Sequence, residues 1–240
     1  MLYIVATPIG NLDDISPRAI FALSSSDIIL AEDTRVTRLL LSKYGIDKPM
    51  SSYHQHSKIK KISEIIGLLE DGKTLSLVSD AGTPGISDPG NFLIQEILKE
   101  LPDLKIVPIP GPNAAIAALS VSGFPTDKFV FLGFPPHKKG RQTFFRRIGG
   151  IEETVVFYES KHRILKALEE LRELSKVNDP VKLPDGSHGA SRPIMIAREL
   201  TKQFETIYRG TIEEVLSKLN KNKENQLGEF VVVLGPRKHK

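Results

Sequence analysis

The feature of this sequence that most constrains its fold is a repeated order of short apolar run, small-residue or polar loop, and amphipathic helix. The clearest example lies between residues 74 and 101. Thr74 to Val78 is a short apolar run, which is typical of a buried strand, and Ile94, Ile97 and Leu101 then recur at helical spacing. Strands that alternate with helices in this way predict a mostly parallel sheet with helices on both faces.

The loop between this strand and helix, residues 78–90, reads Val-Ser-Asp-Ala-Gly-Thr-Pro-Gly-Ile-Ser-Asp-Pro-Gly. Gly82 and Gly85 permit backbone conformations closed to other residues and allow a ligand to lie against bare peptide. Asp88 is expected to cap the helix, with Pro89 at its first position. Ligands of α/β proteins bind at strand-to-helix loops of this kind. A tight connection with good turn chemistry is the alternative, but the density of small residues favours a binding site.

The same order extends along the chain and predicts two domains, residues 1–122 and 123–240, divided at the Gly123-Phe-Pro-Thr126 break. Strands of the first half are expected at residues 2–6, 28–31, 50–53, 74–78 and 105–109, and those of the second half at 129–133, 154–158, 194–197, 204–208 and 229–234. Pro108 and Pro110 place their strand near an edge or an end. Residues 175–193 have no periodicity and predict a long exposed loop.

The composition excludes several kinds of site and reaction. The chain of 240 residues has no cysteine, which excludes disulfides, thiolate metal sites and a cysteine nucleophile. A net charge of +4 permits a nucleic-acid partner. No apolar window is long enough to span a bilayer, and residues 1–11 lack a basic leader. We therefore expect a cytoplasmic protein.

Some common motifs are absent or misplaced. Residues 67–74 match the phosphate-loop pattern, but their order is helix then strand, so Gly72 is expected to be a helix C-cap. His54 and His56 have no third metal ligand at useful spacing, and no metal site is expected. No nucleophile elbow or dinucleotide fingerprint occurs.

Five segments together carry a resemblance. They are Ala-Thr-Pro-Ile-Gly-Asn-Leu (6–12), Ala-Glu-Asp-Thr-Arg (31–35), residues 78–90, Pro-Gly-Pro-Asn-Ala-Ala (110–115) and Arg-Glu-Leu-Thr-Lys (198–202). In this order they resemble the signature segments of the ribosomal RNA small subunit methyltransferase I family, part of the tetrapyrrole-methylase superfamily. The match covers nearly the whole chain.

The resemblance implies a two-domain α/β fold, with a mostly parallel N-terminal sheet, a mixed C-terminal sheet and flanking helices. It implies S-adenosylmethionine in a cleft between the domains, and usually a homodimer. It also implies methylation of the ribose 2'-hydroxyl of a cytidine in the decoding region of 16S ribosomal RNA, within the small ribosomal subunit. Many members are expected to carry a helical extension after the position of Leu234, and the 175–193 loop is longer than expected.

By position, the resemblance assigns cofactor binding to several segments. They contain Pro8, Ile9, Gly10, Gly82, Thr83, Pro84, Ile86, Ala114, Ala115, Tyr158, Arg198, Glu199, Leu200, Gly228 and Glu229.

A sulfonium is already an activated methyl donor, so such an enzyme must align the acceptor oxygen and place a base or polarising group near it. The candidate bases at strand ends are Asp33, Asp80, Asp88, Glu159, Glu199 and His54. A helix cap is the favoured role of Asp88 and an equal alternative for Asp33. Arg35 is expected to position a phosphate or the base. The catalytic assignment is Asp33, Arg35 and Asp80, and the sequence does not choose among them.

RNA contacts are expected from basic side chains. The assigned residues are Arg38, Lys138, Lys139, Arg141, Arg146 and Arg147. The segment from His137 to Arg147 is favoured because it also holds Phe144 and Phe145, which would either stack on a nucleotide or pack under a helix.

Two alternatives remain. A small-molecule tetrapyrrole methylase of the same fold predicts a neutral or apolar acceptor cleft. A non-catalytic, ribosome-associated RNA-binding protein predicts no binding of S-adenosylmethionine.

Overall fold

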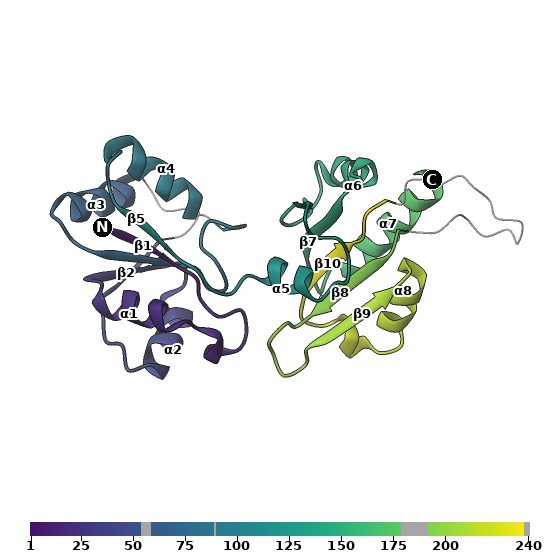
Figure 1. The fold of residues 1–240 in the computed structure, drawn as a ribbon, viewed down its shortest axis with the longest axis horizontal. Coiled ribbons are helices and arrows are strands. Elements are labelled where there is room, and N and C mark those ends of the chain that lie inside the picture. Colours follow the sequence, from purple (N-terminus) through teal and green to yellow (C-terminus); the bar gives the residue numbers. More distant parts are fainter. Residues whose placement is uncertain (54–58, 89, 179–191, 238–240) are drawn as a thin grey trace, which may run out of the picture. The chain divides into compact units, whose positions relative to one another are not determined.

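The computed structural model describes residues 1–53, 59–88, 90–178 and 192–237 (Figure 1). The chain divides into two compact units, Met1–Asn113 and Ala114–Lys240. Each unit has a five-stranded sheet of its own, covered by helices.

The sheet of the first unit is entirely parallel, as the alternation of strands and helices predicts. Its strands, in the spatial order β3-β2-β4-β1-β5, are β3 (Met50–Ser52), β2 (Ile28–Ala31), β4 (Leu75–Val78), β1 (Leu2–Val5) and β5 (Ile106–Ile109). All four residues of the central strand β4 are buried. The proline-containing β5 lies at the edge of the sheet, where a missing N–H is tolerated, so that prediction is confirmed.

Helices cover both faces of this sheet. Helices α1 (Pro17–Ser25) and α2 (Thr34–Lys43) pack on one face, where Leu23 and Leu41 join the core. Helices α3 (Ile59–Glu70) and α4 (Gly90–Glu100) pack on the other face, where Ile65 and Ile97 are buried. A short 3-10 helix, η1 (Leu12–Asp14), precedes α1.

The order of the strands indicates where a ligand would bind to this sheet. Strands β1 and β4 are neighbours, but β1 leads to a helix on one face of the sheet and β4 to a helix on the other. The carboxyl ends of two such strands are the usual ligand site of an open α/β sheet.

The sheet of the second unit is mixed, as expected. It has the order β6-β7-β10-β8-β9, in which β6 and β7 are parallel and the other pairs antiparallel. The strands are β6 (Phe129–Phe131), β7 (Thr154–Ser160), β10 (Glu229–Leu234), β8 (Ile194–Arg198) and β9 (Thr206–Gly210). Helices α6 (Arg141–Gly150), α7 (Ile164–Asn178) and α8 (Ile212–Asn220) share one hydrophobic core on one face, and a 3-10 helix η2 (Lys223–Gln226) follows α8.

Helix α5 (Ala114–Ser120) belongs to this second unit. Its buried face, with Ala115 and Leu119, packs against Val156 and Val231 of the second sheet. The two units therefore divide before α5, whereas the sequence-based boundary between residues 122 and 123 falls after it. The alanine-rich helix carries no signal for which sheet it covers, because its small apolar face fits either.

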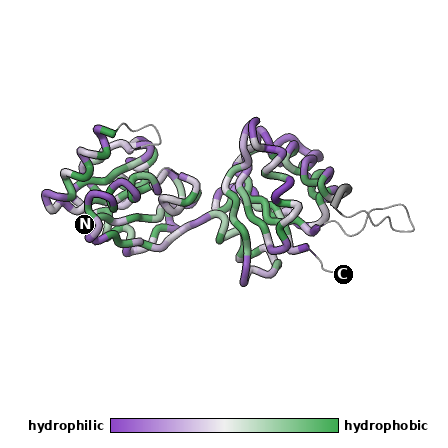
Figure 2. Tube along the Cα trace, turned by 90° about the horizontal axis from the view of Figure 1, so that it is seen from above, coloured by the Kyte–Doolittle hydropathy of each residue, from purple (hydrophilic) through white to green (hydrophobic). Residues whose placement is uncertain are grey.

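Apolar segments run through the interior of each unit, and polar segments lie outside them (Figure 2). None of the helices in the described part of the chain is long and apolar enough to cross a membrane.

Candidate active site

Four of the five signature segments meet at the carboxyl edge of the parallel sheet, and three of them are the loops after β1, β4 and β5. The loop after β1 pairs with the loop after β4, because Thr7 N donates to Gly82 O at 2.9 Å and Gly82 N donates to Thr7 O at 3.0 Å. The Thr7 hydroxyl also donates to Ser79 O at 3.1 Å. The Thr83 hydroxyl donates to Pro112 O in the loop after β5 at 3.1 Å. Segments distant in the sequence thus form one bonded edge.

Gly82 leaves bare backbone at the centre of this edge. It is buried and has a φ of +84°, a conformation that favours glycine. A Cβ atom built there would lie 3.5 Å from Ile9 Cγ2 and 3.7 Å from Pro112 O. Pro8 and Ile9 are buried and Gly10 is exposed. The predicted cofactor residues of the first unit therefore lie together, around a glycine whose Cβ position already touches Ile9 and Pro112.

Asp88 holds the rest of the loop. Its Oδ1 accepts hydrogen bonds from Gly85 N at 2.6 Å and from Gly90 N, the first residue of α4, at 2.8 Å. The capping role predicted for Asp88 is confirmed, while Pro89 lies outside the described residues. Ser87 has a φ of +63°, and strained backbone of this kind clusters at functional sites. Ile86, one residue earlier, is exposed.

The three residues assigned to catalysis lie next to one another, at the ends of β2 and β4. Asp33 N donates to Asp80 Oδ1 at 2.9 Å. Arg35 Nη2 lies 2.6 Å from Asp33 Oδ2 in an ion pair, and the Arg35 side chain is 89% exposed. Asp33 Oδ1 also accepts from Arg35 N at 2.8 Å and caps α2, so the capping alternative is confirmed.

These contacts separate the roles of the two carboxylates. The side-chain hydrogen bond from Arg35, followed by its backbone N–H, lowers the pKa of Asp33 to about 2. A carboxylate with so low a pKa accepts a proton poorly near neutral pH. The same pair raises the pKa of Arg35. Asp80 is exposed, and its charge also contributes to the raised pKa of Arg35, but no ion pair between Asp80 and Arg35 occurs within the described contacts. Asp80 therefore remains a candidate base whose carboxylate is not taken up by Arg35.

In the second unit, Tyr158 and Ala115 are joined. The Tyr158 hydroxyl accepts from Ala115 N at 3.2 Å. Burial raises the pKa of Tyr158, and the hydrogen bond from Ala115 opposes that shift. The Tyr158 ring contacts Phe131 and Phe134, with ring centroids 5.1 Å and 5.3 Å apart. Ala114, adjacent to Ala115, is half-buried.

The Arg198 guanidinium makes its hydrogen bonds within the protein. It is buried and donates to the carbonyl oxygens of Leu227 at 2.6 Å, Phe204 at 3.1 Å and Glu224 at 2.8 Å. Arg198 therefore links three loop segments through its side chain. Its cofactor role stays a prediction, and a contact with the cofactor would have to come from its backbone.

Glu199, which follows Arg198, forms a second corner of the chain that hydrogen bonds hold in place. Glu199 has a φ of +51°, and its Oε1 accepts from Glu229 N at 2.8 Å and Lys202 Nζ at 3.1 Å. Burial opposes ionisation of Glu199, but these hydrogen bonds outweigh it and lower its pKa. A Cβ atom at Gly228 would lie 2.4 Å from Glu199 Cγ, so this position requires glycine. Leu200 packs against the core under α5. Cofactor contact at this corner stays a prediction.

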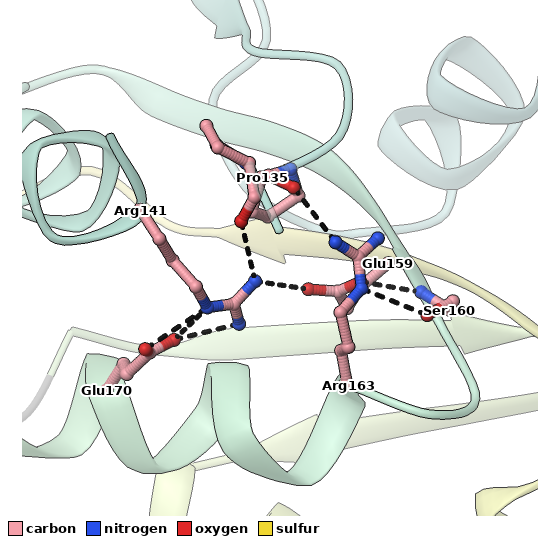
Figure 3. Close-up of polar contacts among 7 residues, drawn as sticks. Pro135, Arg141, Glu159, Ser160, Arg163 and Glu170 are labelled. Atoms are coloured by element: carbon pink, nitrogen blue, oxygen red, sulfur yellow. Dashed lines mark hydrogen bonds and ion pairs between the residues drawn. The ribbon is translucent and has the colours of Figure 1, made fainter. Parts of the chain in front are cut away.

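The structure corrects one of the predicted RNA contacts. Arg141 is buried, and its guanidinium pairs with Glu159 at 3.4 Å and with Glu170 at 2.8 Å (Figure 3). It is therefore not available to a phosphate, because separating it from these carboxylates would leave buried charges uncompensated. Glu159, a candidate base in the sequence, is fully buried in the same ion pairs. The remaining predicted contacts are exposed, namely Arg38, Lys138, Lys139, Arg146 and Arg147.

The phenylalanines of the basic segment pack inward. Phe145 is buried, and Phe144 and Phe145 both make edge contacts with Phe157, at centroid distances of 5.8 Å and 6.2 Å. The exposed aromatic residue beside the basic segment is Phe134, which was not among the predicted contacts. Its signal was its position directly before Pro135, Pro136 and the lysines.

No group of three or more His, Asp or Glu side chains that could hold a metal ion occurs among residues 1–53, 59–88, 90–178 and 192–237. His54 and His56 lie outside these ranges.

Comparison with known proteins agrees with the resemblance seen in the sequence. The family model of tetrapyrrole (corrin/porphyrin) methylases matches residues 1–216. A Thermotoga maritima protein named ribosomal RNA small subunit methyltransferase I is 43% identical over 233 residues, which are 97% of each chain. The protein of the same name from Escherichia coli O157:H7 is 41% identical over 234 residues, 97% of this chain and 77% of that one.

Solved structures show the same fold at low sequence identity. Diphthine synthase superposes with a TM-score of 0.69 at 14% identity, over 99% of this chain and 91% of that one. The methyltransferase CobJ superposes with a TM-score of 0.65 at 20% identity, over 100% and 96%. The family model and the two relatives show that the chain belongs to the ribosomal RNA small subunit methyltransferase I family of tetrapyrrole methylases.

Proposed function

We propose that this chain transfers a methyl group from S-adenosylmethionine to the ribose 2'-hydroxyl of a cytidine in 16S ribosomal RNA, and that it acts in the cytoplasm on the small ribosomal subunit. The observation that carries the proposal is the bonded carboxyl edge of the first sheet. There Gly82 offers bare backbone beside Ile9, and the linked pair of Asp33 and Asp80 lies at the ends of neighbouring strands. The interdomain cleft implied by the resemblance stays a prediction.

When bound, S-adenosylmethionine supplies a methyl group on a positively charged sulfur. The chain then has to hold the donor, align the ribose and take up the hydroxyl proton. Gly82, Thr83 and their partners on the β1 and β5 loops would hold the donor. Asp80 would take the proton. Arg35, oriented by Asp33, would bind an RNA phosphate, because its exposed guanidinium is fixed at one side only.

Methylation of a small tetrapyrrole is less well supported. The solved tetrapyrrole methylases share the fold alone at 20% identity or less, whereas relatives above 40% identity over 97% of this chain carry the ribosomal RNA name. The exposed basic side chains of α6 and the loop before it fit a polyanion better than a small ring.

Incubation of the protein with isotopically labelled S-adenosylmethionine and small ribosomal subunits from cells that lack this chain tests the proposal. We expect label in 16S RNA, recovered as 2'-O-methylcytidine after digestion to nucleosides. Label in a methylated base, or in no RNA, would refute the proposed reaction.

Replacement of Gly82 by asparagine is expected to weaken the binding of S-adenosylmethionine by about 30-fold, or ~2 kcal/mol. Asparagine tolerates a positive φ, so the variant should fold, but its side chain would cover the backbone of residue 82 beside Ile9 and Pro112, where the donor is proposed to lie. Titration calorimetry measures the change. Gly72→Asn is the control, because Gly72 has a φ of +78° with open space around it and caps α3. Equal affinity in both variants would mean that the donor binds elsewhere.

The homodimer implied by the resemblance is also a proposal. Phe21 of α1 and Leu39 of α2 are 66% and 69% exposed, on the helices that cover one face of the first sheet. Exposed large apolar side chains on neighbouring helices fit an interface. Leu39→Glu should convert a dimer to a monomer in sedimentation equilibrium, with Ile59→Glu on α3 as the control. A dimer unchanged by Leu39→Glu would exclude this face.

A further inference from the structure

The loop from Phe134 to Gly140, which joins β6 to α6, is held rigidly at its base. Tyr158 N donates to Gly133 O at 2.9 Å. Arg163 Nη1 donates to Pro135 O at 3.1 Å, and Arg141 Nη1 donates to Pro136 O at 3.4 Å. Two consecutive carbonyl oxygens of the loop are thus fixed by two arginines.

Those arginines are fixed in turn by the same buried carboxylate (Figure 3). Glu159 Oε1 lies 3.0 Å from Arg163 Nε, and Glu159 Oε2 lies 3.4 Å from Arg141 Nη1. The Glu159 side chain has no exposed surface, and those of Arg141 and Arg163 are 5% and 16% exposed. The loop therefore rests on an ion network that is shielded from solvent, so its backbone needs little reorganisation before a partner binds.

The exposed side chains of this loop and of α6 include an aromatic ring and several basic groups. Phe134 is 53% exposed and leans against the Tyr158 ring at 57°. Lys138 and Lys139 are exposed on the same loop, and Arg146 and Arg147 are exposed on the helix that follows. No acidic residue occurs between Phe134 and Arg147, so the exposed side chains that this segment contributes to the surface are basic or neutral.

We infer that Phe134 stacks on an unpaired base of the ribosomal RNA substrate while Lys138 and Lys139 contact the adjacent phosphates. This inference rests on the proposed function and names the residues that recognise its substrate. An exposed aromatic ring beside lysines is the combination by which proteins hold single-stranded RNA, because the ring stacks on any base and the lysines neutralise the backbone. Tyr158 supports the Phe134 ring from behind, so less side-chain freedom is lost on stacking. A flat, neutral surface would lack the lysines that neutralise the RNA backbone.

The test compares substitutions at Phe134 that separate stacking from apolar contact. Stacking of one base contributes roughly 1–3 kcal/mol by alanine substitution, so Phe134→Leu should raise the KM for small ribosomal subunits about tenfold, with kcat unchanged. Phe134→Trp should restore the wild-type KM. Equal KM values for the wild-type and leucine proteins would overturn the inference, as would a leucine variant that tryptophan does not rescue.

The lysines are tested by the salt dependence of binding to the same subunits. Loss of two phosphate contacts on a single strand should lower the slope of log K against log salt concentration by roughly 1.4. We expect this change in the Lys138→Ala/Lys139→Ala double variant and not in the Lys221→Ala/Lys223→Ala control, whose lysines are exposed near η2. An unchanged slope would remove this loop from the interface.

The two kinds of failure are distinguishable. If the wild-type protein transfers no methyl group to the subunits, the proposed function fails. If it does, and the Phe134 and lysine variants behave like the wild type, the function stands and RNA binds to another surface.

Discussion

Asp80→Asn is expected to lower kcat for methyl transfer by about 10²- to 10⁴-fold, the range usual for loss of a general base. The substitution is nearly isosteric, and the asparagine oxygen can still accept the hydrogen bond that Asp33 N donates to Asp80 at 2.9 Å. The link between the β2 and β4 loops should therefore survive, while the capacity to take a proton from the ribose hydroxyl is lost. Single-turnover kinetics with saturating small subunits measures the chemical step directly.

Asp33→Asn is the matched control for that experiment. Asp33 is paired with Arg35 at 2.6 Å and caps α2, so its loss should disturb the orientation of Arg35 and raise the KM for RNA more than it lowers kcat. If Asp33→Asn abolishes turnover and Asp80→Asn leaves kcat within about twofold of the wild type, the two roles are reversed and Asp33 is the base.

Glu159→Gln is expected to destabilise the protein by about 3 kcal/mol, because removal of one partner from a buried ion pair leaves the other charge uncompensated. Glu159 faces both Arg141 and Arg163. The glutamine amide group would place one N–H donor against another at one of these contacts. For a chain of this size, such a loss corresponds to a decrease in Tm of roughly 6–12 °C, which scanning calorimetry measures.

Glu64→Gln is the control for the buried pair. Glu64 lies 3.3 Å from Lys61 on the exposed side of α3, and exposed pairs contribute less than about 1 kcal/mol. A Glu159→Gln protein as stable as the Glu64→Gln protein would show that the network contributes no net stability, and the rigid base of the Phe134 loop would lose its support.

Local signals in the sequence predicted much of the fold. Strand β2 and strand β10 begin and end where the apolar runs do. Asp88 bonds to the N–H of the first residue of α4, as its expected capping role requires. Helix α8 was missed although its signal was present. Its apolar residues recur at helical spacing, and Thr211 and Glu214 form a capping box.

Helix α6 was missed for a different reason. Its sequence is strongly basic, and one of its inward-facing residues is Arg141, which is buried only because Glu159 and Glu170 neutralise it. Those partners come from β7 and α7, so a local pattern cannot show that an arginine belongs inside. The same long-range pairing explains why Arg141 looked like an RNA contact.

The candidate site was predicted in part. The Gly82 loop was proposed as a binding site because a dense run of small residues between a strand and a helix is typical of a ligand-binding loop, and its binding role stays a prediction. The choice between Asp33 and Asp80 was not possible from the sequence, since it depends on the ion pair with Arg35 and on a hydrogen bond between the loops after two strands that are not consecutive in the sequence.

Mapping of ribose methylation in 16S RNA from cells with and without this chain tests the central claim most directly. We expect one cytidine of the decoding region to lose its 2'-O-methyl group when the chain is absent, and to regain it with the wild-type chain but not with Asp80→Asn. Identical methylation maps from the two kinds of cell would contradict the assigned reaction.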